Sequence, residues 1–158
     1  MAEEDWQLTG DASLAARLWE KLDSKLLRQK ARADGLLVAG AIVDWPAAER
    51  DGFGGGAVAT DNRQMAAPMV NSVANAFYWR ALNAMARLAK ATGKTGTSYA
   101  REANRVRDSY LKAFLDPARG IFIDGEGSAH ASLHANLFPL AFGLVPEINK
   151  PSVRALLK

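Results

Sequence analysis

The chain has 158 residues, of which 49% are hydrophobic, so it is long enough to form one domain with a single substantial core. Its formal net charge at pH 7 is +3, and its 20 basic and 17 acidic residues are spread along the sequence without the basic block of a nucleic-acid-binding arm. The absence of cysteine excludes disulfides and thiolate-bound metal centres. We therefore expect residues 1–158 to form one domain that has no nucleic-acid partner.

No membrane partner is expected either. The longest apolar run, "GLLVAGAIV", is shorter than the about 20 residues that a membrane-spanning helix needs. The first residues, "MAEEDWQ", are acidic and lack the basic start of a signal peptide. The default expectation is a cytoplasmic location.

The first predicted element is one amphipathic helix over residues 11–31. Leu14, Leu18, Leu22 and Leu26 recur at a spacing of four, which places them on one face of a helix. Asp11 stands where an acidic side chain caps a first turn. The pattern predicts a single continuous helix with one apolar stripe.

Two further helices are predicted over residues 69–92 and 98–114. Gly93 is a typical helix stop, and Asp116-Pro117 ends the second of these helices. The second helix is expected to bury one face, made of Tyr99, Ala103, Val106, Tyr110 and Phe114. Its opposite face is expected to be solvated, with Arg101, Arg105, Arg107 and Lys112.

The last third of the chain predicts a short strand or hairpin and two more helices. Ile121, Phe122 and Ile123 lie between glycine turns, and Ser128 is placed to cap a helix over "HASLHANLFPLAFGL". Pro151 suits the first turn of a final helix. The overall prediction is an all-α fold of helical hairpins, of the kind that builds arrays and toroids, with at most a short β-hairpin.

The loop "IVDWPAAERDGFGGG", residues 42–56, carries the first group of candidate site residues. Asp44, Glu49 and Asp51 could supply the paired carboxylates of acid/base hydrolysis, and Trp45 could stack on a sugar with Arg50 beside it. The same residues also fit a plain loop. In that alternative Trp45 packs into the core, Asp44 caps a turn, and the remaining three charges form a surface ion-pair cluster.

The two histidines are the second group of candidates. His130 and His134 are four residues apart in the predicted helix and would project from one face. A catalytic zinc needs a third protein ligand, and "HASLH" lacks the glutamate of the HExxH motif, so no metal is expected. "GFGGG" lacks the strand and helix context of a phosphate-binding loop, so no cofactor is expected either.

Several segments together resemble the catalytic (α/α)6 barrel of α-L-rhamnosidases, glycoside hydrolase family 78. The resemblance covers nearly the whole chain. It rests on "TGDASLAARLWEKL", "GLLVAGAIVDWP", "NAFYWRALNAMARLAKATGK", "YAREANRVRDSYLKAFLDPARGIFIDGEGS" and "HASLHANLFPLAFGLVP".

This resemblance implies a rhamnoside-like carbohydrate substrate and roles for particular residues. "DWPAAER" has the spacing of the family's "DCPQRER" acid loop, but its flanks match the later "GDW" loop that lines the sugar subsite. Asp44 and Trp45 are accordingly implied to bind sugar, Glu49 is a weaker catalytic candidate, and His130 is implied to lie near the cavity, while His134 and Asn136 support packing.

The resemblance also implies that residues 1–158 are a fragment of a larger barrel. The family's own acid and base segments have no counterpart here, so the chain alone is expected to hydrolyse glycosides poorly. Apolar faces that would meet the missing hairpins, with Phe77, Leu82, Phe138 and Leu140, are expected to promote self-association, most simply as a dimer.

Three classes of function stay open on this reasoning. The first is a glycoside hydrolase of α-L-rhamnosidase type, or part of one, working by inversion. The second is a catalytically inactive helical module that binds sugar or only assembles. The third is a hydrolase of different specificity that uses Asp44, Glu49 and His130.

Overall fold

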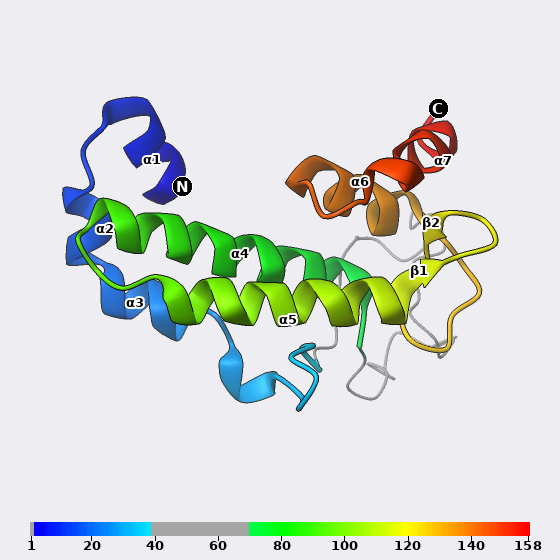
Figure 1. Ribbon diagram of the computed structural model, residues 1–158, viewed down its shortest axis with the longest axis horizontal. Helices are drawn as coiled ribbons and strands as arrows, with labels where there is room; N and C mark the ends of the chain where they lie inside the picture. The colour runs from blue at the N-terminus through cyan, green and yellow to red at the C-terminus, as the bar shows by residue number, and fades with distance from the viewer. Residues whose placement is uncertain (1, 39–69) are drawn as a thin grey trace, which may run out of the picture.

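A long antiparallel pair of helices forms the centre of the structure (Figure 1). The structure is a computed structural model and describes residues 2–38 and 70–158. The central helices are α4 (Ser72–Ala91) and α5 (Thr97–Phe114). Helices α1 (Ala2–Thr9) and α6 (Leu133–Phe142) both contact α4, towards its opposite ends. The largest fully buried side chains include Tyr110, Phe114, Phe122, Leu36 and Leu82.

The α4–α5 hairpin agrees with the prediction apart from small shifts of its ends. Helix α4 begins after Asn71, whose side chain accepts a 2.7 Å hydrogen bond from the amide of Ala74. All five side chains expected on the inner face of α5 are buried. Gly96 is needed where the helices meet, because a Cβ there would lie 2.7 Å from the carbonyl oxygen of Ala86.

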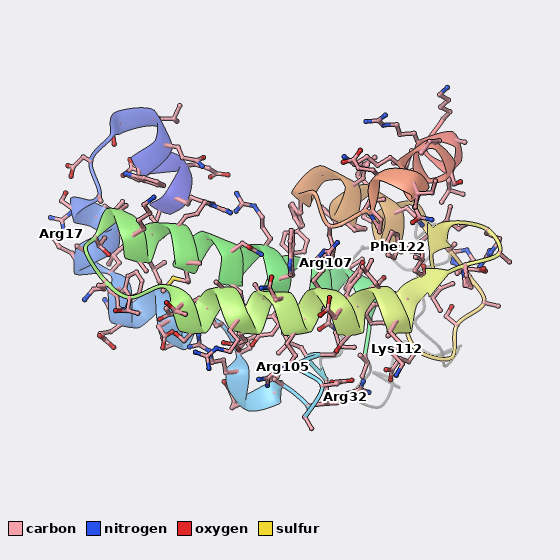
Figure 2. All side chains as sticks on the ribbon, viewed as in Figure 1. Arg17, Arg32, Arg105, Arg107, Lys112 and Phe122 are labelled. Carbon is pink, nitrogen blue, oxygen red and sulfur yellow. The ribbon has the colours of Figure 1, made fainter. Side chains whose placement is uncertain are left out.

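The basic face of α5 is solvated, as predicted. Its four cationic residues, Arg101, Arg105, Arg107 and Lys112, are all exposed, and Figure 2 labels three of them along the helix. Because they lie on the side opposite the buried tyrosines and Phe114, the helix is amphipathic in the expected sense.

The N-terminal region departs from the prediction of one helix over residues 11–31. It forms α2 (Ser13–Arg17), α3 (Trp19–Ser24) and the 3-10 turn η1 (Arg28–Lys30). The chain turns at Leu27, which has a φ of 56°, in the left-handed region. Arg28 then pairs with Asp23 at 2.5 Å and with Glu102 of α5 at 2.9 Å. The tertiary ion pair with Glu102 accompanies a change of chain direction that the leucine spacing does not reveal.

The C-terminal third contains the expected hairpin and two helices. Strands β1 (Leu115–Asp116) and β2 (Ile121–Phe122) pair antiparallel, with Leu115 opposite Phe122. The capping residue of α6 is Ser132, and not Ser128 as was predicted. The side-chain oxygen of Ser132 accepts a hydrogen bond from the amide of Ala135. The 3-10 turn η3 (Glu147–Asn149) leads into α7 (Lys150–Leu156), which has a proline in its first turn as predicted.

The all-α class, with helical hairpins and one short β-hairpin, is therefore confirmed. Four apolar residues were expected to lack cover within the chain, and this expectation is wrong for Leu82. Its side chain projects from α4 into the hydrophobic core and is fully buried. Phe138 and Leu140 are half-buried against that core, and Phe77 is exposed. Within residues 2–38 and 70–158, no helix has both the length and the apolar character needed to span a membrane.

Candidate functional site

Near its start, α4 binds an earlier extended segment through one buried asparagine. The side-chain oxygen of Asn75 accepts a 2.7 Å hydrogen bond from the amide of Leu37. Its side-chain nitrogen donates to the carbonyl oxygen of Leu37 at 3.2 Å and to that of Asn71 at 2.9 Å. The amide group thus satisfies both backbone groups of Leu37, as a neighbouring strand would.

Helix α6 uses the same arrangement. The oxygen of Asn136 accepts from the amide of Phe122 at 2.8 Å, and its nitrogen donates to the carbonyl oxygens of Phe122 at 2.8 Å and Ser132 at 3.0 Å. In both helices the asparagine stands four residues after the capping residue. The sequence signal is the pair "NSVANAF" (71–77) and "SLHANLF" (132–138), which share Ala-Asn-x-Phe and which the sequence analysis did not detect.

The start of α4 is also tied to the turn that follows β2. The amide of Ser72 donates to the carbonyl oxygen of Asp124 at 2.8 Å, and the amide of Glu126 donates to that of Val70 at 3.0 Å. Gly125 permits this approach, because a Cβ there would lie 2.8 Å from the carbonyl oxygen of Val70. Residues 39–69 join the described chain at Val38 and Val70. Val38 follows Leu37, which is bound by Asn75, and Val70 is bound by Glu126.

Five candidate residues of the loop, Asp44, Trp45, Glu49, Arg50 and Asp51, lie outside the described residues. Their predicted roles stay predictions. The described chain defines only the two ends of the segment that carries them, and both ends lie at the start of α4.

His130 lies at the same end of the molecule and contacts a buried carboxylate. Its Nδ1 is 2.7 Å from Oδ2 of Asp124, which is fully buried, whereas 48% of the His130 side chain is exposed. The other carboxylate oxygen, Oδ1, accepts from the amide of Ser132 at 2.7 Å. The Asp124 amide in turn donates to the His130 carbonyl oxygen at 3.0 Å. The ring is thus held against the turn between β2 and α6.

The expectation that both histidines lie on one helix face is wrong. His130 precedes α6, because the helix begins only after Ser132, whereas His134 lies within its first turns. The ring of His134 lies against Phe138, with 5.8 Å between ring centroids. Among residues 2–38 and 70–158, no cluster of three or more His, Cys, Asp or Glu side chains could hold a metal ion.

The arrangement at His130 has a defined chemical capacity. A carboxylate only accepts hydrogen bonds, so the neutral ring facing Asp124 carries its proton on Nδ1. The lone pair on Nε2 is then available to accept a hydrogen bond from a ligand hydroxyl. Sequence reasoning had selected His130 but had missed Asp124, whose signal is its place directly after the "IFI" strand.

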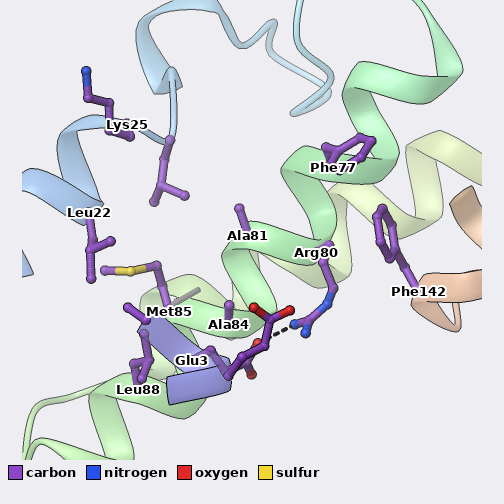
Figure 3. Close-up of a pocket in the computed structure, with 13 residues that line it drawn as sticks. Glu3, Leu22, Lys25, Phe77, Arg80, Ala81, Ala84, Met85, Leu88 and Phe142 are labelled. Atoms are coloured by element: carbon purple, nitrogen blue, oxygen red, sulfur yellow. Dashed lines mark ion pairs between the residues drawn. The ribbon is translucent and has the colours of Figure 1, made fainter. Parts of the chain in front are cut away.

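A cavity lies along α4, between α1 and α6 (Figure 3). This cavity has a volume of about 390 Å³ and a mostly apolar lining that includes Phe77, Met85, Leu88 and Phe142. Its charged lining residues are Glu3, Glu4, Lys25 and Arg80. The residues that line it include neither histidine.

Glu3 is buried between two arginines of α4. Its Oε2 lies 2.6 Å from Nη1 of Arg80, and its Oε1 accepts a hydrogen bond from Nε of Arg87. Burial by itself raises the pKa of the Glu3 carboxyl, but the two arginines more than offset this effect and lower the pKa below its usual value. The ion pairs connect α1 to α4, which indicates a structural role.

Comparison with known proteins gives the class of this fold, a six-hairpin glycosidase domain. Residues 1–157 match the family described as the bacterial alpha-L-rhamnosidase 6 hairpin glycosidase domain. The chain therefore belongs to the bacterial α-L-rhamnosidase six-hairpin glycosidase family. No curated protein sequence matches it significantly.

Two solved structures share the fold at low sequence identity. One is a family 78 rhamnosidase from Bacillus sp. GL1, with a TM-score of 0.73 and 17% identity over 98% of this chain. The other is a rhamnosidase from Klebsiella oxytoca with rhamnose bound, with a TM-score of 0.70 and 16% identity over 96% of this chain. The chain spans 16% of the first protein and 27% of the second.

Proposed function

We propose that this chain is part of a glycoside hydrolase of α-L-rhamnosidase type, and that it contacts carbohydrate at the end where α4 and α6 begin. The family match over residues 1–157 supports the class of reaction. The contact between Asp124 and His130 carries the location, because it holds a half-exposed imidazole at the end where residues 39–69 join the described chain.

In this proposal His130 contacts a sugar hydroxyl and Asp124 positions it. With Nδ1–H directed at Asp124, Nε2 accepts a hydrogen bond from the hydroxyl. The second Asp124 oxygen is held by the amide of Ser132, so the carboxylate cannot rotate away without breaking a buried bond. His134, in the first turn of α6, is proposed as a further sugar contact.

The loop residues supply the remaining proposed contacts. Trp45 stacks on the apolar face of the sugar ring, while Asp44 and Asp51 accept hydrogen bonds from adjacent hydroxyls and Arg50 donates to ring or hydroxyl oxygens. Glu49 and Asp44 are the two residues of this chain whose carboxyl groups we propose for proton transfer. An inverting glycosidase needs an acid and a base about 6.5 to 9.5 Å apart, one protonating the leaving oxygen and the other activating water.

Calorimetric titration with L-rhamnose tests the binding proposal. We expect measurable binding, and we expect His130→Ala to weaken it by about two- to tenfold, the range for one lost hydrogen bond. Asn104→Ala, on the exposed face of α5, is the control and should bind like the parent chain. Absence of binding, or equal affinity of the His130 variant, would refute the proposed location.

Turnover of an aryl α-L-rhamnoside tests the catalytic role separately. If Glu49 is the acid, Glu49→Gln should slow release of the aryl group by about a hundredfold to ten-thousandfold while rhamnose binding persists. Binding without any turnover by the parent chain would favour the alternative of a catalytically inactive sugar-binding module.

A further inference from the structure

The side chain of Asn136 ties together the two ends of the loop that carries Asp124 and His130. Its oxygen accepts a hydrogen bond from the amide of Phe122, and its nitrogen donates to the carbonyl oxygens of Phe122 and Ser132. Phe122 is the last residue of β2, and Ser132 is the capping residue of α6. One side chain therefore fixes where this loop begins and where it ends.

The contact between Asp124 and His130 depends on the same two ends. Asp124 lies two residues after Phe122, and its Oδ1 accepts from the amide of Ser132 at 2.7 Å while its Oδ2 lies 2.7 Å from Nδ1 of His130. Asp124, Ser132 and Asn136 are at most 1% exposed, so a broken bond here leaves a buried polar group unsatisfied. The carboxylate thus keeps its place only while β2 and the start of α6 keep theirs.

Asn75 makes the same set of bonds in another part of the chain. It is also fully buried, and its side-chain amide bonds both backbone groups of Leu37 and the carbonyl oxygen of Asn71. These bonds go to residues 37 and 71 and not to the loop that carries His130. Asn75 therefore provides a matched control, with the same residue type, burial and bonding.

We propose that Asn136 is a positioning residue for His130. By holding Phe122 and Ser132 together, it keeps the Asp124 carboxylate against Nδ1 and so decides which ring nitrogen carries the proton. Nε2 of the neutral ring is then left as a hydrogen-bond acceptor. The effect on the ring requires no carbohydrate, whereas its consequence for sugar binding rests on the proposed function.

Nitrogen-15 chemical shifts of the neutral His130 ring test this proposal. The parent chain should show the Nδ1–H tautomer, and Asn136→Ala should lose this preference and show both tautomers. Asn75→Ala removes an equivalent set of buried bonds but should keep the Nδ1–H tautomer of the parent chain. A parent-like ring in the folded Asn136 variant, or an equal loss in both variants, would overturn the proposal.

Circular dichroism establishes that each variant is folded. Asn136→Ser, which keeps one hydrogen-bonding group in the buried site, is the second variant and should show the same change to a smaller extent.

Hydrogen exchange of the parent chain tests the same link without a substitution. If one side chain holds both ends of the loop, the amides of Phe122 and Ser132 should exchange in one opening event, at a common rate after correction for their intrinsic rates. A Ser132 amide that exchanges more than about tenfold faster than that of Phe122 would contradict the proposal, because the two ends would then open separately.

Calorimetric titration with L-rhamnose separates this inference from the proposed function. If the parent chain binds, Asn136→Ala should weaken binding by about two- to tenfold, as His130→Ala does. Unchanged affinity of the folded variant would count against the positioning role. If the parent chain does not bind but the tautomer changes as expected, the proposed function fails and the role of Asn136 stands.

Discussion

Asn75 and Leu37 are 38 positions apart in the sequence and are joined by a two-way hydrogen bond, in which one side-chain amide serves both backbone groups of the leucine. The pair lies in the buried interior at the start of α4. It holds the chain where residues 39–69 begin, and the equivalent pair of Asn136 and Phe122 holds the hairpin that leads to His130. The same asparagine–backbone hydrogen bonding therefore holds both segments that lead to the candidate site.

Asn75→Ala is expected to destabilise the fold. It leaves the buried amide and carbonyl of Leu37 without the side chain that satisfies them, at a cost of about 1 to 3 kcal/mol in the free energy of unfolding. Urea unfolding measures this change. Asn104→Ala, at an exposed position, should stay within about 0.5 kcal/mol of the parent chain, and an equal effect of both variants would contradict the assigned role.

The protonation of His130 can be observed directly. Because Nδ1 faces the Asp124 carboxylate, the neutral ring should be the Nδ1–H tautomer, which nitrogen-15 chemical shifts of the imidazole identify. Asp124→Ala removes the acceptor and should abolish this preference. A neutral His130 with its proton on Nε2 in the parent chain would contradict the geometry.

Glu3 should make stability depend on acidity. Its pKa is lower in the folded chain than its ordinary value of 4.5, because Arg87 and Arg80 more than offset the opposing effect of burial. A lowered folded pKa stabilises the fold above the unfolded pKa, and this contribution is lost as the pH falls through the folded pKa. Glu3→Gln should therefore cost about 1 to 3 kcal/mol at neutral pH and progressively less in acid.

Unfolding of both proteins by urea at about pH 7 and about pH 3 measures that difference. Glu20→Gln is the control, since Glu20 is exposed on α3. If the loss caused by Glu3→Gln is the same at both values, the ion pairs with Arg80 and Arg87 do not contribute as described.

Gly96 should not tolerate a larger side chain. A Cβ at this position would lie 2.7 Å from the carbonyl oxygen of Ala86, so Gly96→Ala must push α4 and α5 apart. We expect the free energy of unfolding to fall by about 1 to 3 kcal/mol in a thermal or urea melt. Thr97→Ala, at the next and exposed position, should change little. Unchanged stability of Gly96→Ala would show that the helices can separate freely.

Much of the fold follows from local sequence signals. The spacing of apolar residues predicted α4 and α5, because each helix buries one continuous face against the other and carries its own stop signals at Gly93 and Pro117. The same reasoning failed over residues 11–31. Leu27 turns the chain in a left-handed conformation, and Arg28 pairs with Glu102, which is distant in sequence. Leucine spacing carries no information about either feature.

The candidate site divides in the same way. By itself the sequence determined the helical class, the solvated face of α5, the family resemblance and the interest of His130, because these depend on residue type and local spacing. Only the tertiary structure decided that Asp124 contacts His130 and that His134 faces Phe138. It also decided that Asn75 and Asn136 each hydrogen-bond the backbone of another segment. Buried polar groups must find partners wherever the packed chain brings them, and that choice depends on the whole fold.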